Sequence, residues 1–332
     1  MGTFSSDQTE ERILKHSIEQ IVADRFGNSS VPITVQRKRC TYIGSYDCDL
    51  INAQLSTGEE FELFLKDYRV SQKSKDEPEL RRERELRVYR DLLSQTELGP
   101  PEFYGSVWDE ATGRYWIFLE FVDGVVIQHQ DVDYAMLAAE WLGGMQGFLI
   151  QHQEILGSCD FLIRQDGAFF RSKAEQALWN VAHISPPSAR RLTEIVDSYE
   201  QVIEVLEAQP LCLVHGGYIP WHILVDIKHT PTRVCAVDWE SAALGPTLYD
   251  LAYFTHEMET QSRDRVLNAY RRAAIQHQVP TASRTQMQFI VDCLRVHRVL
   301  DWLSRGLEKC FSETKVSKLV DQAEQLSRSV LS

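Results

Sequence analysis

Apolar and polar residues alternate at two different periods in the N-terminal third of the chain. Over residues 7–26 the apolar positions recur at helical spacing, which predicts an amphipathic helix. Its buried face is expected to consist of Leu14, Ile18, Ile21 and Val22. The period then shortens to two, which is typical of half-buried strands. The predicted strands are residues 31–39, 42–55 and 60–68. A turn at residues 56–59 is expected to close a hairpin between the last two.

A second helix and a second pair of strands follow. Residues 79–93 carry apolar side chains at helical spacing, which predicts a helix. The residues expected to face inward are Leu86, Tyr89 and Leu93. Two more aromatic-rich strands are expected at residues 102–108 and 115–121. A turn at 109–113 joins them, and residues 122–124 have the composition of a linker.

The pattern after this linker is mainly helical. Helices are predicted at residues 134–151, 167–182 and 189–207, and again from residue 247 to the C-terminus. Pro186-Pro187 is expected to interrupt the chain before the third of them. A strand-rich segment, residues 211–239, lies among the helices. The chain is therefore predicted to be an α+β protein with two lobes, a β-rich lobe over residues 1–122 and a helical lobe over residues 123–332.

Composition and charge narrow the functional classes. The 332 residues carry a net charge of −13, which argues against binding to nucleic acid because that requires a basic face. No apolar stretch approaches the length that spans a membrane. The seven cysteines include no CxxC pair, which disfavours a disulfide framework or a structural zinc site. These features predict a cytoplasmic protein without a nucleic-acid or membrane partner.

The candidate chemistry lies in the segment 211–254. Its apolar runs are residues 211–214, 223–225 and 234–237. A polar loop between the first two runs begins with His215-Gly216 and ends near His222. The third run ends at Asp238, and Tyr249-Asp250 follows after a short interval. A strand, a polar loop and two further strands are therefore expected, with Asp238 at the tip of the last strand.

This order and spacing resemble the catalytic segment of the aminoglycoside phosphotransferase and choline kinase family, which has a protein-kinase-like fold. In that family the loop reads His-Gly-Asp, four residues, then Asn. The Asp orients or deprotonates the acceptor hydroxyl, and the Asn binds a metal ion. His215 and Gly216 match this motif, whereas Gly217 stands in place of the Asp and His222 in place of the Asn.

The resemblance extends to the segment that follows. Asp238, followed by Trp239-Glu240, matches the family motif that binds the metal ion bridging the nucleotide phosphates. Glu240 is a candidate second ligand. Asp250 matches an aspartate that supports the catalytic loop by hydrogen bonding, and His215 is expected to have a structural role in that loop. The resemblance implies that the functional side chains at positions 217 and 222 have been replaced, whereas the surrounding residues of the motif are retained.

A nucleotide site in the β-rich lobe is also implied. Lys66 ends an apolar strand, where the family has the lysine that holds the α- and β-phosphates. Glu85 is its favoured partner on the next helix, and Glu83 is the alternative. Backbone groups near Glu120 and Val122 are expected to bind adenine. The remaining nucleotide contacts are expected from Gly44, Ser45 and Leu224.

The two loop substitutions affect chemistry in different ways. Loss of a general base typically slows a reaction by about 10²–10⁴-fold, but phosphoryl transfer depends mainly on positioning and charge stabilisation. A Gly217 enzyme is therefore expected to be slow rather than inactive, with His222 as one candidate base. Imidazole suits softer metal ions than Mg²⁺. The implied cofactors are ATP and Mg²⁺, with Mn²⁺ as the alternative, at a site formed by His222, Asp238 and Glu240.

Three functions are open from the sequence. The first is an ATP-dependent phosphotransferase acting on a hydroxyl of a small molecule or of a peptide Ser/Thr, which Lys66, Glu85 and Asp238 favour. The second is a pseudokinase that binds a nucleotide or a partner protein without transfer, which Gly217 and His222 favour. The third is a kinase-like component of peptide natural-product dehydration, where phosphorylation of Ser/Thr precedes a lyase. We favour the first.

Overall fold

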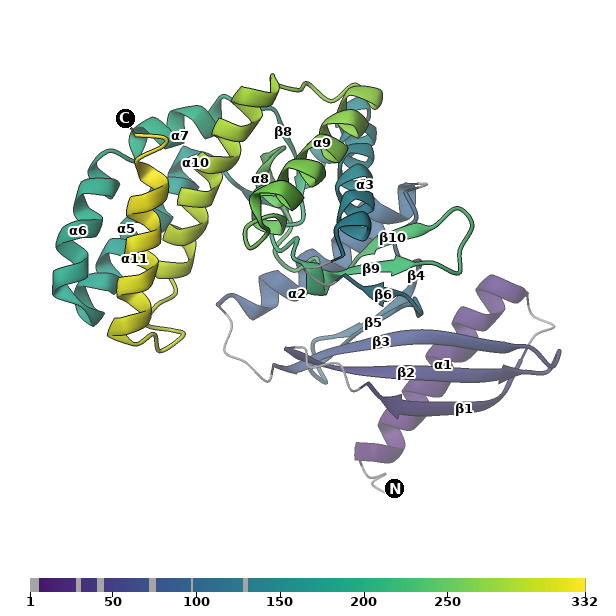
Figure 1. Cartoon of the computed structure of the whole chain (residues 1–332). Helices are drawn as coiled ribbons and strands as arrows, with labels where there is room; N and C mark the ends of the chain where they lie inside the picture. Colours follow the sequence, from purple (N-terminus) through teal and green to yellow (C-terminus); the bar gives the residue numbers. More distant parts are fainter. Residues whose placement is uncertain are drawn as a thin grey trace. The chain divides into compact units, whose positions relative to one another are not determined.

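The computed structural model of the chain describes residues 6–27, 31–40, 45–71, 76–96, 98–127 and 131–331. It divides into two compact units, each described by itself (Figure 1). The first comprises Met1–Gln95 and Gly99–Asp123, and the second comprises Thr96–Leu98 and Gly124–Ser332. Within the described ranges, no helix combines the length and the apolar character needed to cross a membrane.

A five-stranded antiparallel sheet in the order β1-β2-β3-β5-β4 forms the first unit. Its strands are β1 (Pro32–Arg39), β2 (Tyr46–Leu55), β3 (Glu60–Ser71), β4 (Phe103–Asp109) and β5 (Arg114–Glu120). Helix α1 (Ser6–Phe26) lies along one face of this sheet (Figure 1). Its predicted apolar face is confirmed, because Leu14, Ile18, Ile21 and Val22 are all buried in a cluster with sheet residues.

Helix α2 (Pro78–Arg87) continues into a less regular segment of the same helix. That segment consists of a π-helical turn, η1 (Val88–Leu92), and a short 3-10 turn, η2 (Leu93–Gln95). The sequence predicted one regular helix as far as Leu93. The expected inward residues Leu86, Tyr89 and Leu93 are buried, so their helical spacing survives the irregular turns. A five-residue π turn has no distinctive periodicity and could not be recognised from the pattern.

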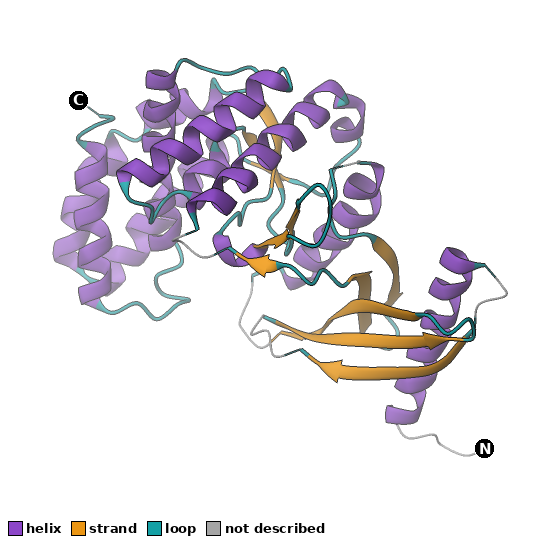
Figure 2. Cartoon of the chain, turned by 45° about the vertical axis from the view of Figure 1, so that its right-hand side comes forward, coloured by secondary structure: helices purple, strands orange, loops and turns teal. Residues whose placement is uncertain are grey.

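The second unit is mainly helical and contains two small sheets (Figure 2). Its helices are α3 (Val132–Gln151), α4 (Gln153–Gly157), α5 (Gly167–Ile184), α6 (Pro186–Asp197), α7 (Glu200–Glu207), η3 (Pro220–His222), α8 (Tyr249–Phe254), α9 (Thr260–Gln276), α10 (Arg284–Leu303) and α11 (Glu313–Ser327). One sheet has the order β10-β9-β6 and the other β7-β11-β8. Their strands are β6 (Val125–Val126), β7 (Ile163–Arg164), β8 (Leu211–Val214), β9 (Ile223–Asp226), β10 (Arg233–Ala236) and β11 (Ala243–Pro246).

The break predicted at Pro186-Pro187 is present, but the helix predicted after it was wrong. Helix α5 ends at Ile184, and α6 begins at Pro186, because proline fits the first helical turn, where its missing N–H is not needed. The single helix predicted over 189–207 is instead split between α6 and α7 at Ser198 and Tyr199. The buried hydroxyl of Tyr199 lies 2.9 Å from Nδ1 of His297 at this break. A tertiary contact of this kind leaves no signal in local periodicity.

Helices α3 and α9 approach each other closely through glycine. A Cβ atom on Gly147 would lie 2.4 Å from the Cβ of His277 and 2.6 Å from its carbonyl oxygen. Gly143 sits one turn earlier, where a Cβ would lie 3.0 Å from the Cβ of Ala273. Glycine is therefore required for this packing, and the same helix pair flanks the segment that carries the candidate chemistry.

We expect Gly147→Ala to lower the free energy of unfolding by about 1–3 kcal/mol, because the added methyl group must displace backbone atoms of His277. Urea denaturation measures this change. Gly157→Ala is the matched control, since a Cβ at Gly157 meets nothing within 4 Å, and it should stay within about 0.5 kcal/mol of wild type. Equal effects of the two substitutions would contradict the close approach of α3 and α9.

Candidate active site

The predicted catalytic loop connects β8 to β9, and His215 is its structural centre. The N–H of Gly217 donates to Nδ1 of His215 (3.2 Å), so the proton resides on Nε2, which donates to the Val237 carbonyl (2.9 Å). Burial, helped by nearby His222, lowers the pKa of His215 to about 3. The ring is therefore neutral and uses both nitrogens to tie the loop to the segment before Asp238, which leaves it a positioning role.

Asp250 supports the same loop from the first turn of α8. Its buried carboxylate accepts hydrogen bonds from the backbone N–H groups of His215 (2.6 Å) and Gly216 (3.0 Å). This confirms the hydrogen-bonding role expected for Asp250. Gly216 has a left-handed φ of 73°, and a Cβ there would lie 2.1 Å from the carbonyl oxygen of Ser241. Only glycine fits at Gly216, so the loop backbone is fixed independently of the catalytic side chains.

Gly217 leaves no side chain at the position where the family has its base. A Cβ there would lie 3.6 Å from Nδ1 of both His215 and His222, which is ordinary van der Waals contact. Neighbouring aromatic residues are directed elsewhere: the buried Tyr218 hydroxyl donates to the Ala138 carbonyl (2.9 Å), and Trp221 is 56% exposed. The position therefore has room for the first atom of a side chain.

His222 faces Asp238 with a ring nitrogen that carries no proton in the neutral ring. Its Nδ1 lies 2.8 Å from the carbonyl oxygen of Gly217, and a carbonyl can only accept, so Nδ1 is the donor. The remaining nitrogen, Nε2, lies 3.4 Å from Oδ2 of Asp238. Two acceptor atoms at this separation repel each other unless a proton or a metal cation lies between them. A histidine held through Nδ1 in this way has the tautomer common among metal ligands.

Asp238 itself adopts an uncommon backbone conformation. Its φ of 68° places it in the left-handed region, which costs a non-glycine residue about 1–2 kcal/mol and is concentrated at functional sites. The next residue, Trp239, is buried, and its ring lies 4.4 Å from the ring of His215. Because Trp239 anchors the loop between them, Asp238 and Glu240 both remain partly exposed.

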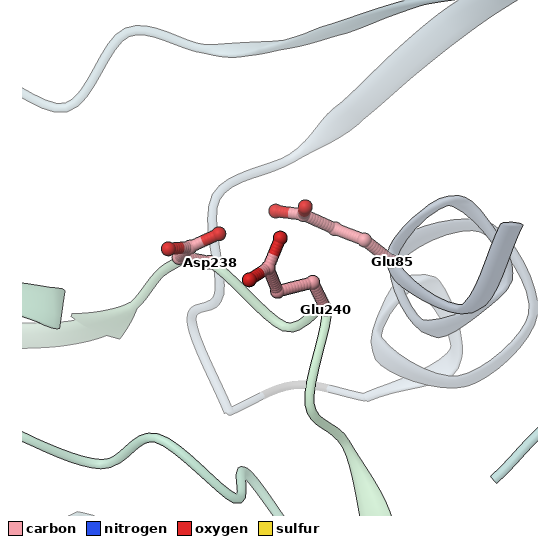
Figure 3. Close-up of side chains that lie close together, drawn as sticks. All are labelled: Glu85, Asp238 and Glu240. Carbon is pink, nitrogen blue, oxygen red and sulfur yellow. The ribbon is translucent and has the colours of Figure 1, made fainter. Parts of the chain in front are cut away.

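The carboxylates of Asp238 and Glu240 are close enough to act together. One oxygen of each lies within 4.8 Å of the other, and Figure 3 shows both side chains on the loop after β10. The third labelled residue, Glu85, belongs to α2 in the first unit. Nε2 of His222 and Oδ2 of Asp238, 3.4 Å apart, are close enough to share a divalent cation. A pair of one nitrogen and one oxygen donor suits Mn²⁺ better than Mg²⁺.

Lys66 and Glu85 form a buried ion pair in the first unit. The Nζ atom of Lys66, on β3, lies 2.9 and 2.7 Å from the two carboxylate oxygens of Glu85, on α2. Their side chains are 11% and 1% exposed. The structure thus joins Lys66 to Glu85, the favoured of the two candidate glutamates. The phosphate-binding role of this pair stays a prediction.

Two aromatic residues near Lys66 were missed by the sequence analysis. The ring centres of Tyr46 and Tyr68 lie 5.7 and 5.2 Å from Nζ of Lys66, which is within cation–π range. Tyr68 could have been found from strand alternation, because residues 66 and 68 lie on the same face of β3. Tyr46 depends on the pairing of β2 with β3, which the sequence does not specify residue by residue.

Acidic residues follow the loop between β1 and β2, where Gly44 and Ser45 are expected to contact the nucleotide phosphates, and they are paired with arginines. Asp49 is buried and pairs with Arg37 (2.7 Å), and Asp47 forms an ion pair with Arg39. These pairs reduce the repulsion that two free carboxylates would exert on a phosphate. Of the residues predicted for this loop, Gly44 lies outside the described residues, and Ser45 is half-buried just before β2.

The segment predicted to receive adenine offers an unused backbone N–H group at one of its two named residues. The N–H of Glu120 is already used, because it donates to the Glu102 carbonyl (2.8 Å). Val122 is buried, and its N–H makes no hydrogen bond to any residue that the structure describes. It is therefore the better candidate for a base contact. In the second unit, Leu224 lies on β9, paired with Cys235 of β10 and Val126 of β6.

Sequence comparison identifies the class of protein that this fold and loop define. The model of the phosphotransferase enzyme family matches residues 51–290. The chain therefore belongs to this family, as the catalytic segment suggested. Among curated proteins, no sequence matches the chain.

Solved structures of several phosphotransferases resemble the chain. The GDP complex of wild-type aminoglycoside 2'-phosphotransferase-IIIa has a TM-score of 0.62 and 14% identity, covering 94% of this chain and 98% of that one. Ethanolamine kinase of Plasmodium vivax has a TM-score of 0.58 and 12% identity, with 98% and 96% covered. A microcompartment-associated aminopropanol kinase has a TM-score of 0.56 and 14% identity, with 90% and 94% covered. The predicted protein-kinase-like α+β fold is confirmed.

The pKa of Asp250 allows a test of how this residue stabilises the loop after β8. Burial raises this pKa from its ordinary value to about 7, although the two backbone hydrogen bonds lower it. The folded state therefore favours the protonated acid. Its contribution to stability is complete below the ordinary carboxyl pKa and is lost as the pH rises through about 7.

We expect the free energy of unfolding of wild type, minus that of Asp250→Asn, to fall by up to about 4 kcal/mol between about pH 4 and pH 8. This difference is the stability margin. The asparagine variant lacks this titration, so the difference isolates Asp250 from other ionising groups. Urea denaturation of both proteins at several pH values measures the margin. A margin that rises with pH would mean that the hydrogen bonds outweigh burial.

Proposed function

We propose that this chain is a nucleotide-dependent phosphotransferase that transfers a phosphoryl group, with ATP as donor, to a hydroxyl of a small molecule. The observation that carries the proposal is the pair of acceptor atoms that His222 and Asp238 present to each other at 3.4 Å. A proton or a metal cation between the two atoms would relieve their repulsion, and the pair lies where the family binds its metal ion. The substitution of the family asparagine therefore alters the metal site without removing it.

In the first unit, Lys66 is proposed to hold the nucleotide phosphates. Glu85 orients its ammonium group through both carboxylate oxygens. The flanking rings of Tyr46 and Tyr68 further restrict where that charge can lie. The N–H of Val122 would donate to the base, which is consistent with its burial and with the lack of another acceptor among the described residues.

In the second unit, Asp238 and His222 would hold the metal ion, with Glu240 as a further carboxylate. A divalent cation in this position neutralises charge on the phosphates during transfer. His222 cannot ligate through Nε2 and also act as a base, because Nδ1 is already committed to Gly217. We assign it to the metal. Transfer then proceeds without a protein base, which the loose transition state of phosphoryl transfer tolerates at a lower rate.

The first test measures thermal unfolding with ATP or ADP in the presence of Mg²⁺ or Mn²⁺. We expect the nucleotide to raise the unfolding midpoint of wild type by several degrees in a metal-dependent way, and more with Mn²⁺ than with Mg²⁺. A ligand at about 100 times its Kd adds about 2.7 kcal/mol of stability. Asp238→Asn should lose the metal-dependent part, and His222→Asn should shift the preference toward Mg²⁺. Asparagine tolerates the left-handed conformation, so Asp238→Asn tests the charge without added strain.

Asp133→Asn is the control for this measurement, since the Asp133 side chain is 88% exposed and is not part of the proposed site. It should respond as wild type does. The proposal fails if no combination of nucleotide and metal shifts the unfolding midpoint of wild type. It also fails if the metal-dependent shift is the same in Asp238→Asn and Asp133→Asn.

A pseudokinase is the second candidate function, favoured by the missing carboxylate at Gly217. The room for a Cβ at this position makes the base restorable. We expect wild type to transfer phosphate slowly and Gly217→Asp to raise kcat by up to about 10²–10⁴-fold. Gly217→Ala is the matched control and should give no gain. Transfer of label from γ-labelled ATP to a panel of amino alcohols, hydroxy acids and Ser/Thr peptides measures this.

The panel separates the two candidates. Nucleotide binding by wild type with no transfer to any acceptor, together with transfer gained in Gly217→Asp, would support a pseudokinase. The amino alcohols are included because the names of two of the similar kinases specify ethanolamine and aminopropanol.

A further inference from the structure

A group of arginines that have no role in the proposed site occupies the second unit. Arg263 comes from α9, and Arg295 and Arg298 come from α10. His256 joins them from the turn between α8 and α9. Burial and then the neighbouring charge of Arg295 lower the pKa of Arg263. Burial, followed by Arg298 and Arg295, lowers the pKa of His256 to about 4. Arg295 is therefore close enough to repel both Arg263 and a charged His256, and Arg298 is close enough to repel a charged His256.

The hydrogen bonds around the cluster leave several donors unused. Arg295 pairs with Asp292 (3.1 Å), and Arg298 donates to the Tyr253 carbonyl (3.2 Å). The Arg263 side chain makes no hydrogen bond or ion pair within the described part of the chain. The buried Nε atoms of Arg263 and Arg295 and the buried Nδ1 of His256 have no partner there either. Buried N–H groups without acceptors are rare because each costs free energy.

Nearby carboxylates compensate this charge only in part. Asp292 is engaged with Arg295, and Asp264 is engaged with Arg284 (3.2 Å). Burial lowers the pKa of Arg298, and the nearby Tyr253 and the exposed Glu257 oppose this only in part. A concentration of guanidinium groups is unexpected in a chain of net charge −13. Guanidinium groups bind carboxylates and phosphates through paired hydrogen bonds, so an anionic group would compensate the charge.

We propose that Arg263, Arg295 and Arg298 form a binding site for an anionic group, a carboxylate or a phosphate, of a small molecule. The site is accessible, because Arg263, Arg295 and His256 are each only half-buried. It is also connected to the catalytic loop. Arg298 contacts Tyr253, which lies one helical turn from Asp250 on α8, about 5 Å along the helix axis. The anionic group belongs either to the phosphoryl acceptor or to a separate effector.

The first experiment uses inorganic phosphate and citrate as probes, without nucleotide or metal. Thermal unfolding of the full chain is followed as each anion is titrated at constant ionic strength with NaCl. We expect a saturable rise of about 2–4 °C in wild type. Arg263→Gln and Arg295→Gln should lose this rise. Arg265→Gln is the matched control, because Arg265 is an exposed residue of the same helix that pairs with Asp133, and it should keep the rise.

A second readout distinguishes binding from a purely structural role. Without an anion, Arg263→Gln removes an uncompensated charge, so its unfolding midpoint should equal or exceed that of wild type. A merely structural arginine would lower it. The proposal is overturned if the anions raise the unfolding midpoint of wild type no more than NaCl does. It is also overturned if the anions shift the midpoints of Arg263→Gln and Arg265→Gln equally. This outcome is independent of nucleotide binding, so it can be separated from a failure of the proposed function.

The acceptor panel then identifies the source of the anionic group, and this arm rests on the proposed function. If the group belongs to the acceptor, hydroxy acids are phosphorylated and Arg263→Gln raises their KM by about tenfold or more with little change in kcat. If it belongs to an effector, phosphate or citrate alters transfer to uncharged acceptors without being consumed, and Arg263→Gln abolishes that response. Either result supports the site.

Discussion

The active-site half of the second unit depends on one buried carboxylate. Asp250 accepts the backbone N–H groups of His215 and Gly216 and so fixes the start of the catalytic loop. His215 then extends this order to the segment before Asp238 through its bond to the Val237 carbonyl. Because these contacts use backbone groups and a neutral ring, the shape of the site does not depend on which side chains stand at positions 217 and 222.

The chemistry of the site follows from this fixed frame. His222 is attached to the loop through the Gly217 carbonyl, and its other nitrogen is thereby directed at Asp238. In the proposed metal site, an asparagine at 222 would offer an oxygen in a comparable place, so histidine there would replace a hard ligand by a softer one. The arginine cluster is a second proposed binding site in the same unit. Its positive charge contrasts with the amine-bearing substrates named for two similar kinases.

The parts of the fold that were predictable are those in which local sequence and tertiary structure agree. The amphipathic pattern of α1 and the Lys66 strand were readable because one face of each is buried. Strands β6, β7 and β11 have only two to four residues, which is too short for periodicity to distinguish. The Arg263–Arg295–Arg298 cluster joins α9 and α10 across about thirty residues, and helical spacing alone did not indicate which of the many arginines would meet there.

A loop whose stability and chemistry reside in different residues has an evolutionary consequence. Exchanges at positions 217 and 222 alter no contact on which folding depends, apart from the ring bond of His222 to the Gly217 carbonyl. Such a lineage can drift between active and silent forms, or from one metal to another, while the protein continues to fold. Substitutions at Gly216 or Asp250, in contrast, would be removed by selection for folding, whatever reaction the protein performs.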